Sequence, residues 1–415
     1  MLPYETPPTL WILPVLSMFL IFSLMSVFVI YGYPSWRVIS HANLPESHVF
    51  LAWFVVASIA TLPHLYIGLR SSSIPSIAKD GIAWATYVSL GFAMITFSMF
   101  VIRDVIWLAY REATRFIEFS TTARSATNGV EFQDHVVHSL NLILLVIAGG
   151  TTLIGFVGAR RKPTVTEVQI PIHNLPQGLR NFRIVQLSDI HVGPTIKRAF
   201  VQKIVDTVSE LDPDLIALTG DLADGSVSVL EKDVAPLGQM KSRHGNFFVT
   251  GNHDYYSGID QWLIKIKKLG FRPLLNEHHL ITHQGGSLVV AGVTDISNTS
   301  ASDKNQHKSD PEAAFRFSPT SDVRILLAHQ PKTAESAHHV DFHLQLSGHT
   351  HGGQFIPWKY LIPLQQPFVA GLHRLKKNSW IYVSRGTGYW GPPIRLGASS
   401  EISLITLVTN TENDQ

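Results

Sequence analysis

Residues 182–193 read FRIVQLSDIHVG, so a short apolar run ends abruptly in an aspartate and a histidine, Asp189 and His191. Short runs rich in apolar and β-branched residues, bounded by turn residues, are typical of buried strands. Two side chains that stand two residues apart, just past a strand, can both reach one ion across a tight turn. The stretch therefore predicts a strand that carries two potential metal ligands at its carboxyl end.

The same pattern occurs four more times, in a fixed order, in the second half of the chain. Apolar runs at 215–218, 246–249, 324–327 and 342–346 each lead directly into a polar motif. These motifs are Gly220-Asp221-Leu222-Ala223-Asp224, Gly251-Asn252-His253-Asp254, Ala328-His329-Gln330-Pro331 and Gly348-His349-Thr350-His351. In layered α/β folds, ligands cluster at the carboxyl ends of the strands, so we expect these side chains to meet at one edge.

The donors in these motifs are imidazoles, carboxylates and one amide, and sulfur is excluded because the chain has no cysteine. Such a set suits paired divalent ions of the Mn, Fe, Zn or Mg type. Two ions about 3.5–4 Å apart clamp a phosphoryl group and turn a bound water into a hydroxide nucleophile. Each motif alone is weak evidence, because a Gly-Asp pair is often only a turn. All five together, each after a strand, indicate a two-metal phosphoesterase site.

The composition divides the chain in two. Its 415 residues are too many for one ordinary domain, and long apolar runs give way to a mixed globular sequence near residue 160. We therefore predict two domains, 1–159 and 160–415. The second begins with a strand at 164–172, which its proline assigns to a sheet edge. The net charge of +2 comes without a basic tract, so the sequence carries no nucleic-acid footprint.

Four segments of the first domain are long and apolar enough to span a bilayer, which takes about 20 residues. They lie at 10–33, 49–69, 82–102 and 140–157, and none contains Asp, Glu, Lys or Arg. The first lacks the basic start of a signal peptide. We expect a four-helix transmembrane region. The lack of intramembrane charge argues against a transporter or sensor as the main function, although this remains an alternative.

Charges near the spans suggest an orientation. The cluster Arg160-Arg161-Lys162 directly follows the last span, and the positive-inside rule counts residues close to span ends. We therefore expect a multi-pass protein of the inner or plasma membrane with its second domain in the cytoplasm. Residues 103–119 mix apolar side chains with Arg and Glu, which fits either a helix in the headgroup region or a polar extension of the third span.

Residues from about 164 to 407 resemble the calcineurin-like metallophosphoesterase superfamily, in particular its small bacterial membrane-associated phosphodiesterase branch. The resemblance is carried by 182–193, by Asn174-Leu175-Pro176, by Leu327-Ala328-His329-Gln330-Pro331, by Gly348-His349-Thr350-His351-Gly352-Gly353-Gln354 and by Ser384-Arg385-Gly386-Thr387-Gly388. It implies an α/β fold, a layered β-sandwich flanked by helices, with two metal ions at the carboxyl ends of strands. The apolar first domain lies outside the resemblance.

The resemblance also implies a role for each residue of the motifs. The first ion would be held by Asp189, His191 and His351, the second by Asn252, His329 and His349, and both by Asp221. His253 would stabilise the phosphate or protonate the leaving oxygen, and Asp254 would help to orient its ring. The alternative for His253 is a structural residue beside the ligands. Asp224 is expected near the site but not as a ligand.

The family includes enzymes that cleave UDP-2,3-diacylglucosamine, so a lipid-linked phosphodiester or diphosphate is the expected substrate of a site beside the bilayer. A tethered phosphodiesterase or phosphatase with a soluble substrate is the alternative. A non-catalytic scaffold is disfavoured because all seven ligand positions are filled. Residues 358–375 depart from the family pattern and form either a substrate or membrane edge or a plain surface loop. Serine replaces the usual proline before Glu401.

Overall fold

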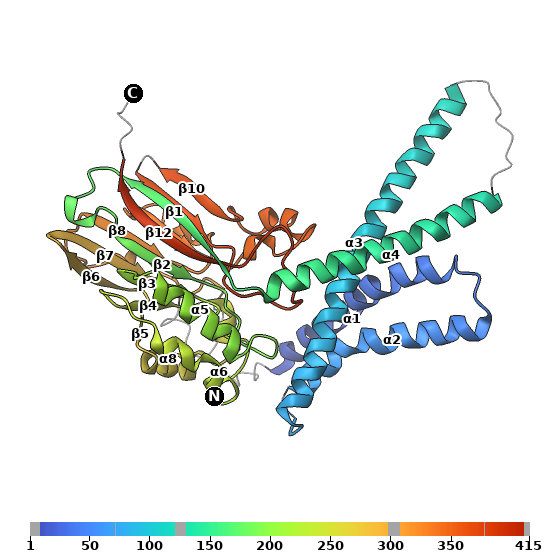
Figure 1. Cartoon of the computed structure of the whole chain (residues 1–415), viewed down its shortest axis with the longest axis horizontal. Helices are drawn as coiled ribbons and strands as arrows, with labels where there is room; N and C mark the ends of the chain where they lie inside the picture. Colours follow the sequence, from blue (N-terminus) through green and yellow to red (C-terminus); the bar gives the residue numbers. More distant parts are fainter. Residues whose placement is uncertain (1–8, 71, 121–129, 298–307, 377, 411–415) are drawn as a thin grey trace, which may run out of the picture. The chain divides into compact units, whose positions relative to one another are not determined.

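The structure, a computed structural model, describes residues 9–70, 72–120, 130–297, 308–376 and 378–410. It contains two compact units, Met1–Leu153 and Ile154–Gln415. The boundary between them lies slightly earlier in the chain than the one expected from composition. The first unit is helical and the second is built on two sheets (Figure 1).

The helical unit contains α1 (Thr9–Ile39), α2 (Glu46–Leu69), α3 (Ser76–Ser120) and most of α4 (Val130–Arg160). Three stretches of the described residues are long and apolar enough to cross a membrane: Glu46–Leu69, Ser76–Phe116 and Val136–Arg160. This count is one fewer than the predicted four. The remaining predicted span, 10–33, falls in α1, but the side chains before Ser23 lie outside the described residues, and the rest of α1 is too short to qualify.

Helix α3 continues well past residue 102, where the predicted third span ends. Of the two interpretations of 103–119, the polar extension of the span agrees with this uninterrupted helix. Asp104 on this extension lies 2.7 Å from Arg37 of α1 and 2.7 Å from its neighbour Arg103, and it also accepts a hydrogen bond from Tyr33. Asn141 of α4 contacts Arg103 and donates to the carbonyl of Arg37. A polar cluster therefore joins three helices of this unit.

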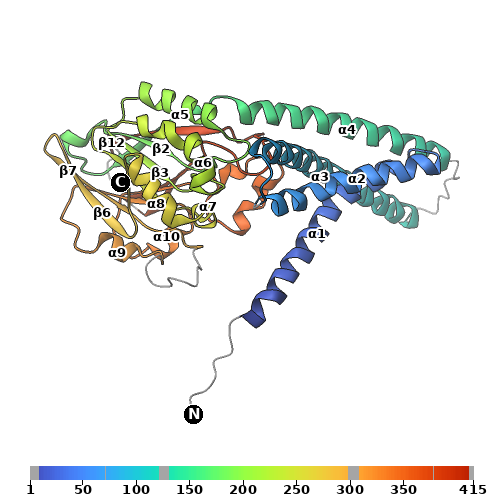
Figure 2. The same ribbon diagram turned by 90° about the horizontal axis from the view of Figure 1, so that it is seen from below.

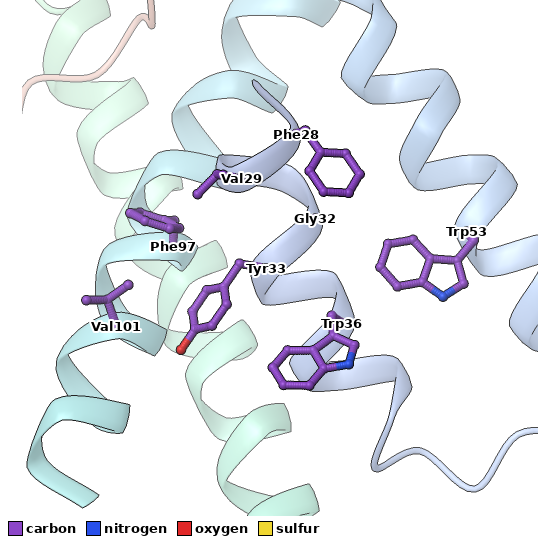
Figure 3. A pocket seen from close by; sticks show the side chains of 8 residues that line it. All are labelled: Phe28, Val29, Gly32, Tyr33, Trp36, Trp53, Phe97 and Val101. Carbon is purple, nitrogen blue, oxygen red and sulfur yellow. The ribbon is translucent and has the colours of Figure 1, made fainter. Parts of the chain in front are cut away.

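An apolar cavity of about 670 Å³ lies beside this cluster (Figure 3). It is lined by Phe28, Val29, Gly32, Tyr33, Trp36, Trp53, Phe97 and Val101, which come from α1, α2 and α3. Tyr33 belongs to both features, because its ring lines the cavity and its hydroxyl donates to Asp104.

The second unit contains two six-stranded sheets with the strand orders β1-β12-β2-β3-β4-β5 and β10-β11-β9-β8-β7-β6. The strands of the first sheet are β1 (Thr164–Ile172), β2 (Arg183–Leu187), β3 (Leu215–Thr219), β4 (Asn246–Val249), β5 (Phe271–Pro273) and β12 (Glu401–Thr409). Those of the second are β6 (Glu277–His283), β7 (Gly286–Gly292), β8 (Val323–Leu327), β9 (Leu344–Ser347), β10 (Gly371–Lys376) and β11 (Ser379–Val383). Strand β1 lies at a sheet edge, as its proline predicts.

The two sheets pack face to face and are covered by helices on their outer sides. Ile184 and Phe247 of the first sheet share a core with Val290 and Leu344 of the second. On its outer face, the first sheet packs against α5 (Arg198–Glu210), α6 (Val227–Val234) and α8 (Ile259–Lys268). The second sheet packs against α9 (Pro311–Phe315), and Figure 2 shows α5 and α9 on opposite sides of the sheets. The predicted sandwich flanked by helices is confirmed.

The strands that precede the polar motifs run parallel within their sheets. Strands β2, β3 and β4 are parallel neighbours in the first sheet, and β8 and β9 are parallel neighbours in the second. They are buried on both faces, which explains why the apolar runs before the motifs are nearly continuous rather than alternating. The segments that follow these strands carry every predicted ligand. In the segment after β4, the ligand Asn252 is the first residue of α7 (Asn252–Tyr256).

Candidate metal centre

The ligand loops turn so sharply that most of the predicted ligands have left-handed backbone conformations. The φ angles are 53° at Asp189, 53° at His191, 54° at Asp221, 69° at His349 and 52° at His351. Residues other than glycine seldom adopt this region, because it costs free energy. Its concentration in one set of side chains is typical of a functional site.

Two glycines make the close approach of these loops possible. A Cβ atom on Gly251 would overlap Asp221 Oδ1, and one on Gly348 would overlap Asp189 Oδ2. Any side chain at either position would push a carboxylate out of the site. The glycines that begin the Gly-Asn-His-Asp and Gly-His-Thr-His motifs are therefore part of the geometry that gathers the ligands.

The gathered side chains form overlapping groups of possible metal ligands. In each group, the donor atoms lie within 4.8 Å of one another: Asp189 with His191 and His351, Asp221 with His329 and His349, and His191 with Asp221 and His253. Asp221 belongs to two groups, which is the arrangement expected of a bridging carboxylate. The structure thus brings together six of the seven predicted ligands, all except Asn252, from loops as far as 160 residues apart.

The donor atoms of these groups face one another. His191 Nε2 lies 3.1 Å from His351 Nε2, and His329 Nε2 lies 3.2 Å from both His349 Nδ1 and Asp221 Oδ2. Other contacts hold the far sides of two rings: His329 Nδ1 is 2.8 Å from the carbonyl of Thr219, and His191 Nδ1 is 3.2 Å from Asp224. A ring whose Nδ1 donates a hydrogen bond keeps Nε2 free for a metal ion.

An orphaned buried atom supports the same interpretation. Asn252 Oδ1 is buried, and no hydrogen-bond donor reaches it among the described residues. A buried carbonyl oxygen without a partner costs about 1–3 kcal/mol. A divalent cation at Asn252 would satisfy this oxygen, and one between His329 and His349 would separate their facing nitrogens. The residues present therefore fit a pair of divalent ions.

The electrostatics of the metal-free site point the same way. Burial disfavours the charged forms, but the carboxylate of Asp221 raises the pKa of His329 well above its ordinary value. Burial likewise opposes protonation of His191, yet Asp224 and Asp221 raise its pKa to about 9. Burial, and then the positive charge of His329, lower the pKa of His349 to about 3. Without metal, the site thus holds protons where a cation would neutralise the same carboxylates.

The partner of the His253 ring differs from the prediction. Asp254, which was expected to orient this ring, instead accepts hydrogen bonds from the backbone amides of Gly251, Asp221 and Leu222, at 2.8 to 3.0 Å. The carboxylate beside His253 is Asp224, whose Oδ1 lies 2.7 Å from His253 Nδ1. The reason is that Asp254 sits in the first turn of α7 and caps the neighbouring loops, whereas Asp224 reaches across from the loop after β3.

Two aromatic rings flank His253. The rings of Tyr256 and Trp390 each lie 5.4 Å from the His253 ring, centroid to centroid, and both side chains are more than half exposed. Trp390 was absent from the predicted site because it lies far along the chain, after β11, outside the five motifs.

Comparisons with known proteins agree with this geometry. The model of the family described as calcineurin-like phosphoesterase matches residues 182–353. A transmembrane protein with metallophosphoesterase domain from Danio rerio is 40% identical over 272 residues, 64% of this chain and 62% of that protein. An uncharacterized metallophosphoesterase from Helicobacter pylori is 37% identical over 261 residues, 62% of this chain and 67% of that protein.

An uncharacterized metallophosphoesterase from Aquifex aeolicus is 33% identical over 246 residues, which are 59% of this chain and 91% of that protein. The chain spans about three fifths of the length of its Danio rerio relative, at 62%. In all three comparisons the matched part is about as long as the sheet-containing unit that holds the ligand groups. The chain therefore belongs to the calcineurin-like phosphoesterase family.

Proposed function

We propose that this chain is a membrane-anchored, metal-dependent phosphohydrolase that cleaves a phosphodiester or diphosphate bond. The observation that carries the proposal is the convergence of histidines and aspartates at the carboxyl ends of parallel strands, with Asp221 shared by two of the groups. Nitrogen and oxygen donors in this arrangement are the ligands of two-metal phosphoesterases.

We assign the ligands as the family resemblance implies. The first ion would be held by Asp189, His191 and His351, the second by Asn252, His329 and His349, and both by Asp221. The donor set fits Mn, Fe, Zn or Mg. When bound, such ions neutralise charge on the phosphoryl group and supply a nucleophile from water near neutral pH.

His253 is assigned the other end of the reaction axis. Its Nδ1 faces Asp224 at 2.7 Å, so Nε2 is available to the substrate. As a general acid, the ring would donate a proton from Nε2 to the leaving oxygen, while Asp224 holds Nδ1 and so orients the ring. In an in-line displacement at phosphorus, both the entering and the leaving oxygen must be stabilised, and we assign the leaving oxygen to His253.

We further propose that the substrate is lipid-linked, with UDP-2,3-diacylglucosamine as a concrete candidate. Support comes from the three apolar helices of the same chain and from the exposed rings of Tyr256 and Trp390 beside His253. The protein would be a multi-pass protein of the inner or plasma membrane. Arg160, Arg161 and Lys162 at the end of the last span support a cytoplasmic catalytic unit.

The test is a substrate screen with the full chain in detergent micelles. Phosphomonoesters, phosphodiesters and lipid nucleoside diphosphates are each supplied with Mn²⁺, Fe²⁺, Zn²⁺ or Mg²⁺, and the Asp221→Asn variant serves as control. We expect metal-dependent hydrolysis that is fastest on a lipid-linked diphosphate or diester. Faster turnover of water-soluble esters would overturn the lipid assignment. Hydrolysis that survives chelation would overturn the metal dependence, and no hydrolysis with any metal would overturn the phosphohydrolase itself.

A further inference from the structure

The last turns of α4 belong to the same compact unit as the metal centre. The unit begins at Ile154, while the candidate membrane span extends to Arg160. Residues 154–160 therefore form the end of an apolar helix and also belong to the sheet-containing unit. Their contacts within this unit show which segment they hold in place.

Residues 386–396, the loop segment after β11, pack against this helix end. The backbone N–H of Arg395 donates to the carbonyl of Gly155 at 2.9 Å, and the guanidinium of Arg160 donates to the hydroxyl of Tyr389 at 2.9 Å. Two glycines of the helix make the contact close. A Cβ on Gly155 would lie 2.5 Å from Ile394 Cγ2, and one on Gly158 would lie 2.8 Å from the carbonyl oxygen of Arg395.

The other side of the 386–396 segment lies against the metal centre. Gly388 donates its N–H to the carbonyl of Asp189 at 3.0 Å, and the ring of Trp390 flanks His253. Arg395 Nη1 donates to the carbonyl of His351 at 2.8 Å, and its Nη2 lies 3.2 Å from Nδ1 of the same histidine. The segment therefore contacts both ends of the first group of ligands.

Arg395 is held from many directions. Its side chain is almost fully buried and also donates to the carbonyls of Arg385 and Gly388. A buried guanidinium is tolerated only where such hydrogen bonds are made, so its position is tightly determined. Groups that hold a metal ligand from outside the metal's own coordination typically contribute about 10–100-fold to metal affinity or activity.

We propose that the end of α4 positions His351 through Arg395, so that this membrane helix is a structural part of the metal centre as well as an anchor. Arg395 is a positioning residue in this proposal, since it acts through His351 and does not touch substrate. The inference rests on the proposed assignment of His351 to the first ion. It predicts that a change in the membrane helix alters metal binding at one site of the pair.

The first test inserts side chains into α4 of the full chain. Gly158→Val places a side chain against the carbonyl of Arg395, whereas Gly150→Val, the matched control, meets open space among the described residues. Mn²⁺ affinity is measured in detergent by competition with a chelator. We expect Gly158→Val to weaken one of two sites by about 10–100-fold and to spare the other, with Gly150→Val unchanged. Wild-type affinity at both sites in Gly158→Val would overturn the inference.

The second test asks whether the helix acts through Arg395. Arg395→Lys keeps the charge but loses the fork of donors, so it should weaken the same site. If the two residues act in series, Gly158→Val added to Arg395→Lys costs little beyond the single Arg395→Lys change. Fully additive losses would mean that the helix reaches the metal centre by another route, which would overturn the proposal.

A third pair of variants covers the case in which Gly158→Val does not fold. The Cβ of Gly155→Ala overlaps only the side chain of Ile394, since the backbone nitrogen of Arg395 lies at an ordinary contact distance of 3.8 Å. Gly155→Ala should therefore weaken the site, and Gly155→Ala with Ile394→Ala should restore it. Lack of rescue in folded protein would contradict the proposal. The outcomes also separate the two proposals: a wild-type protein that binds no pair of ions refutes the proposed function, whereas normal metal binding in the folded helix variants refutes only this inference.

Discussion

Asp224 Oδ1 lies 2.7 Å from Nδ1 of His253 and 3.2 Å from Nδ1 of His191. One carboxylate thus holds a proposed metal ligand and the proposed acid, whose rings pack edge to face with centroids 4.8 Å apart. Because each ring presents Nδ1 to Asp224, each keeps Nε2 for the centre of the site. The proposed metal ligand and the proposed acid therefore share this side chain as a partner.

Asp224→Asn should impair both functions at once. The amide keeps the size of the side chain but removes the carboxylate that orients the rings of His253 and His191. We expect a loss of about 10–100-fold in kcat together with weaker binding of one metal ion. Steady-state kinetics and metal analysis of the purified variant check this. Asp254→Asn is the comparison, because Asp254 bonds only backbone amides in the described structure and should affect thermal stability more than chemistry.

Asp221→Asn should be among the most damaging single changes. It removes the charge shared by the two groups of ligands, so both ions lose affinity and hydrolysis of an activated phosphodiester falls to background. Chelation of the wild type should give the same loss, and added Mn²⁺ should reverse only the chelated sample. Full activity in a folded Asp221→Asn protein would refute the two-metal assignment.

His253→Ala should separate chemistry from metal binding. Metal content should stay near that of the wild type, while kcat falls by about 10²–10⁴-fold if the ring is the general acid. The loss should shrink for leaving groups of low pKa, which need no proton. A series of aryl phosphodiesters measures this dependence. If the variant instead loses an ion, His253 is a ligand and its assigned role is wrong.

Metal binding should release protons. Burial lowers the pKa of His191, but Asp224 and Asp221 outweigh it and raise the pKa to about 9 in the metal-free protein. A metal ion takes the neutral ring, so affinity should rise with pH up to about 9.

Calorimetry at pH 7.5, in buffers that differ in ionisation enthalpy, measures the number of protons released. A binding enthalpy that is the same in every buffer would contradict the expected proton release.

The stability of the metal-free protein should change with pH in the opposite direction to the metal affinity. Because the folded-state pKa of His191 is raised, its contribution is fully present below the unfolded value of about 6.5 and is lost as pH rises through about 9.

The sequence predicted most of the side chains that the structure brings together, because the information is local to each strand end. An apolar run such as 215–218, which is buried on both faces, predicts a strand. Because neighbouring strands are parallel, the residues that follow them lie at the same edge of the sheet. The proline of β1 likewise predicts an edge position, because it lacks the N–H that an inner strand needs.

Local sequence patterns could not predict the contacts between loops. Asp224 and Asp254 are both aspartates beside the site, and only the packing of the loop after β3 on α7 decides which one meets His253. The glycines of α4 resemble those of any apolar helix, and their partner, Arg395, lies more than 230 residues later. The predicted third span ends where hydropathy falls at Arg103, and hydropathy alone could not decide that the helix continues beyond it, as α3 does.

The left-handed backbone at five ligand positions makes the site a store of strain. Each such residue costs about 1–3 kcal/mol, and a glycine would relieve that cost without changing the path of the chain. A descendant that gave up hydrolysis could therefore gain stability by the same substitutions that delete its ligands. In other proteins of this fold, substitution of these residues by glycine would be favoured once hydrolysis is no longer under selection. This chain has an aspartate or a histidine at every one of the five positions.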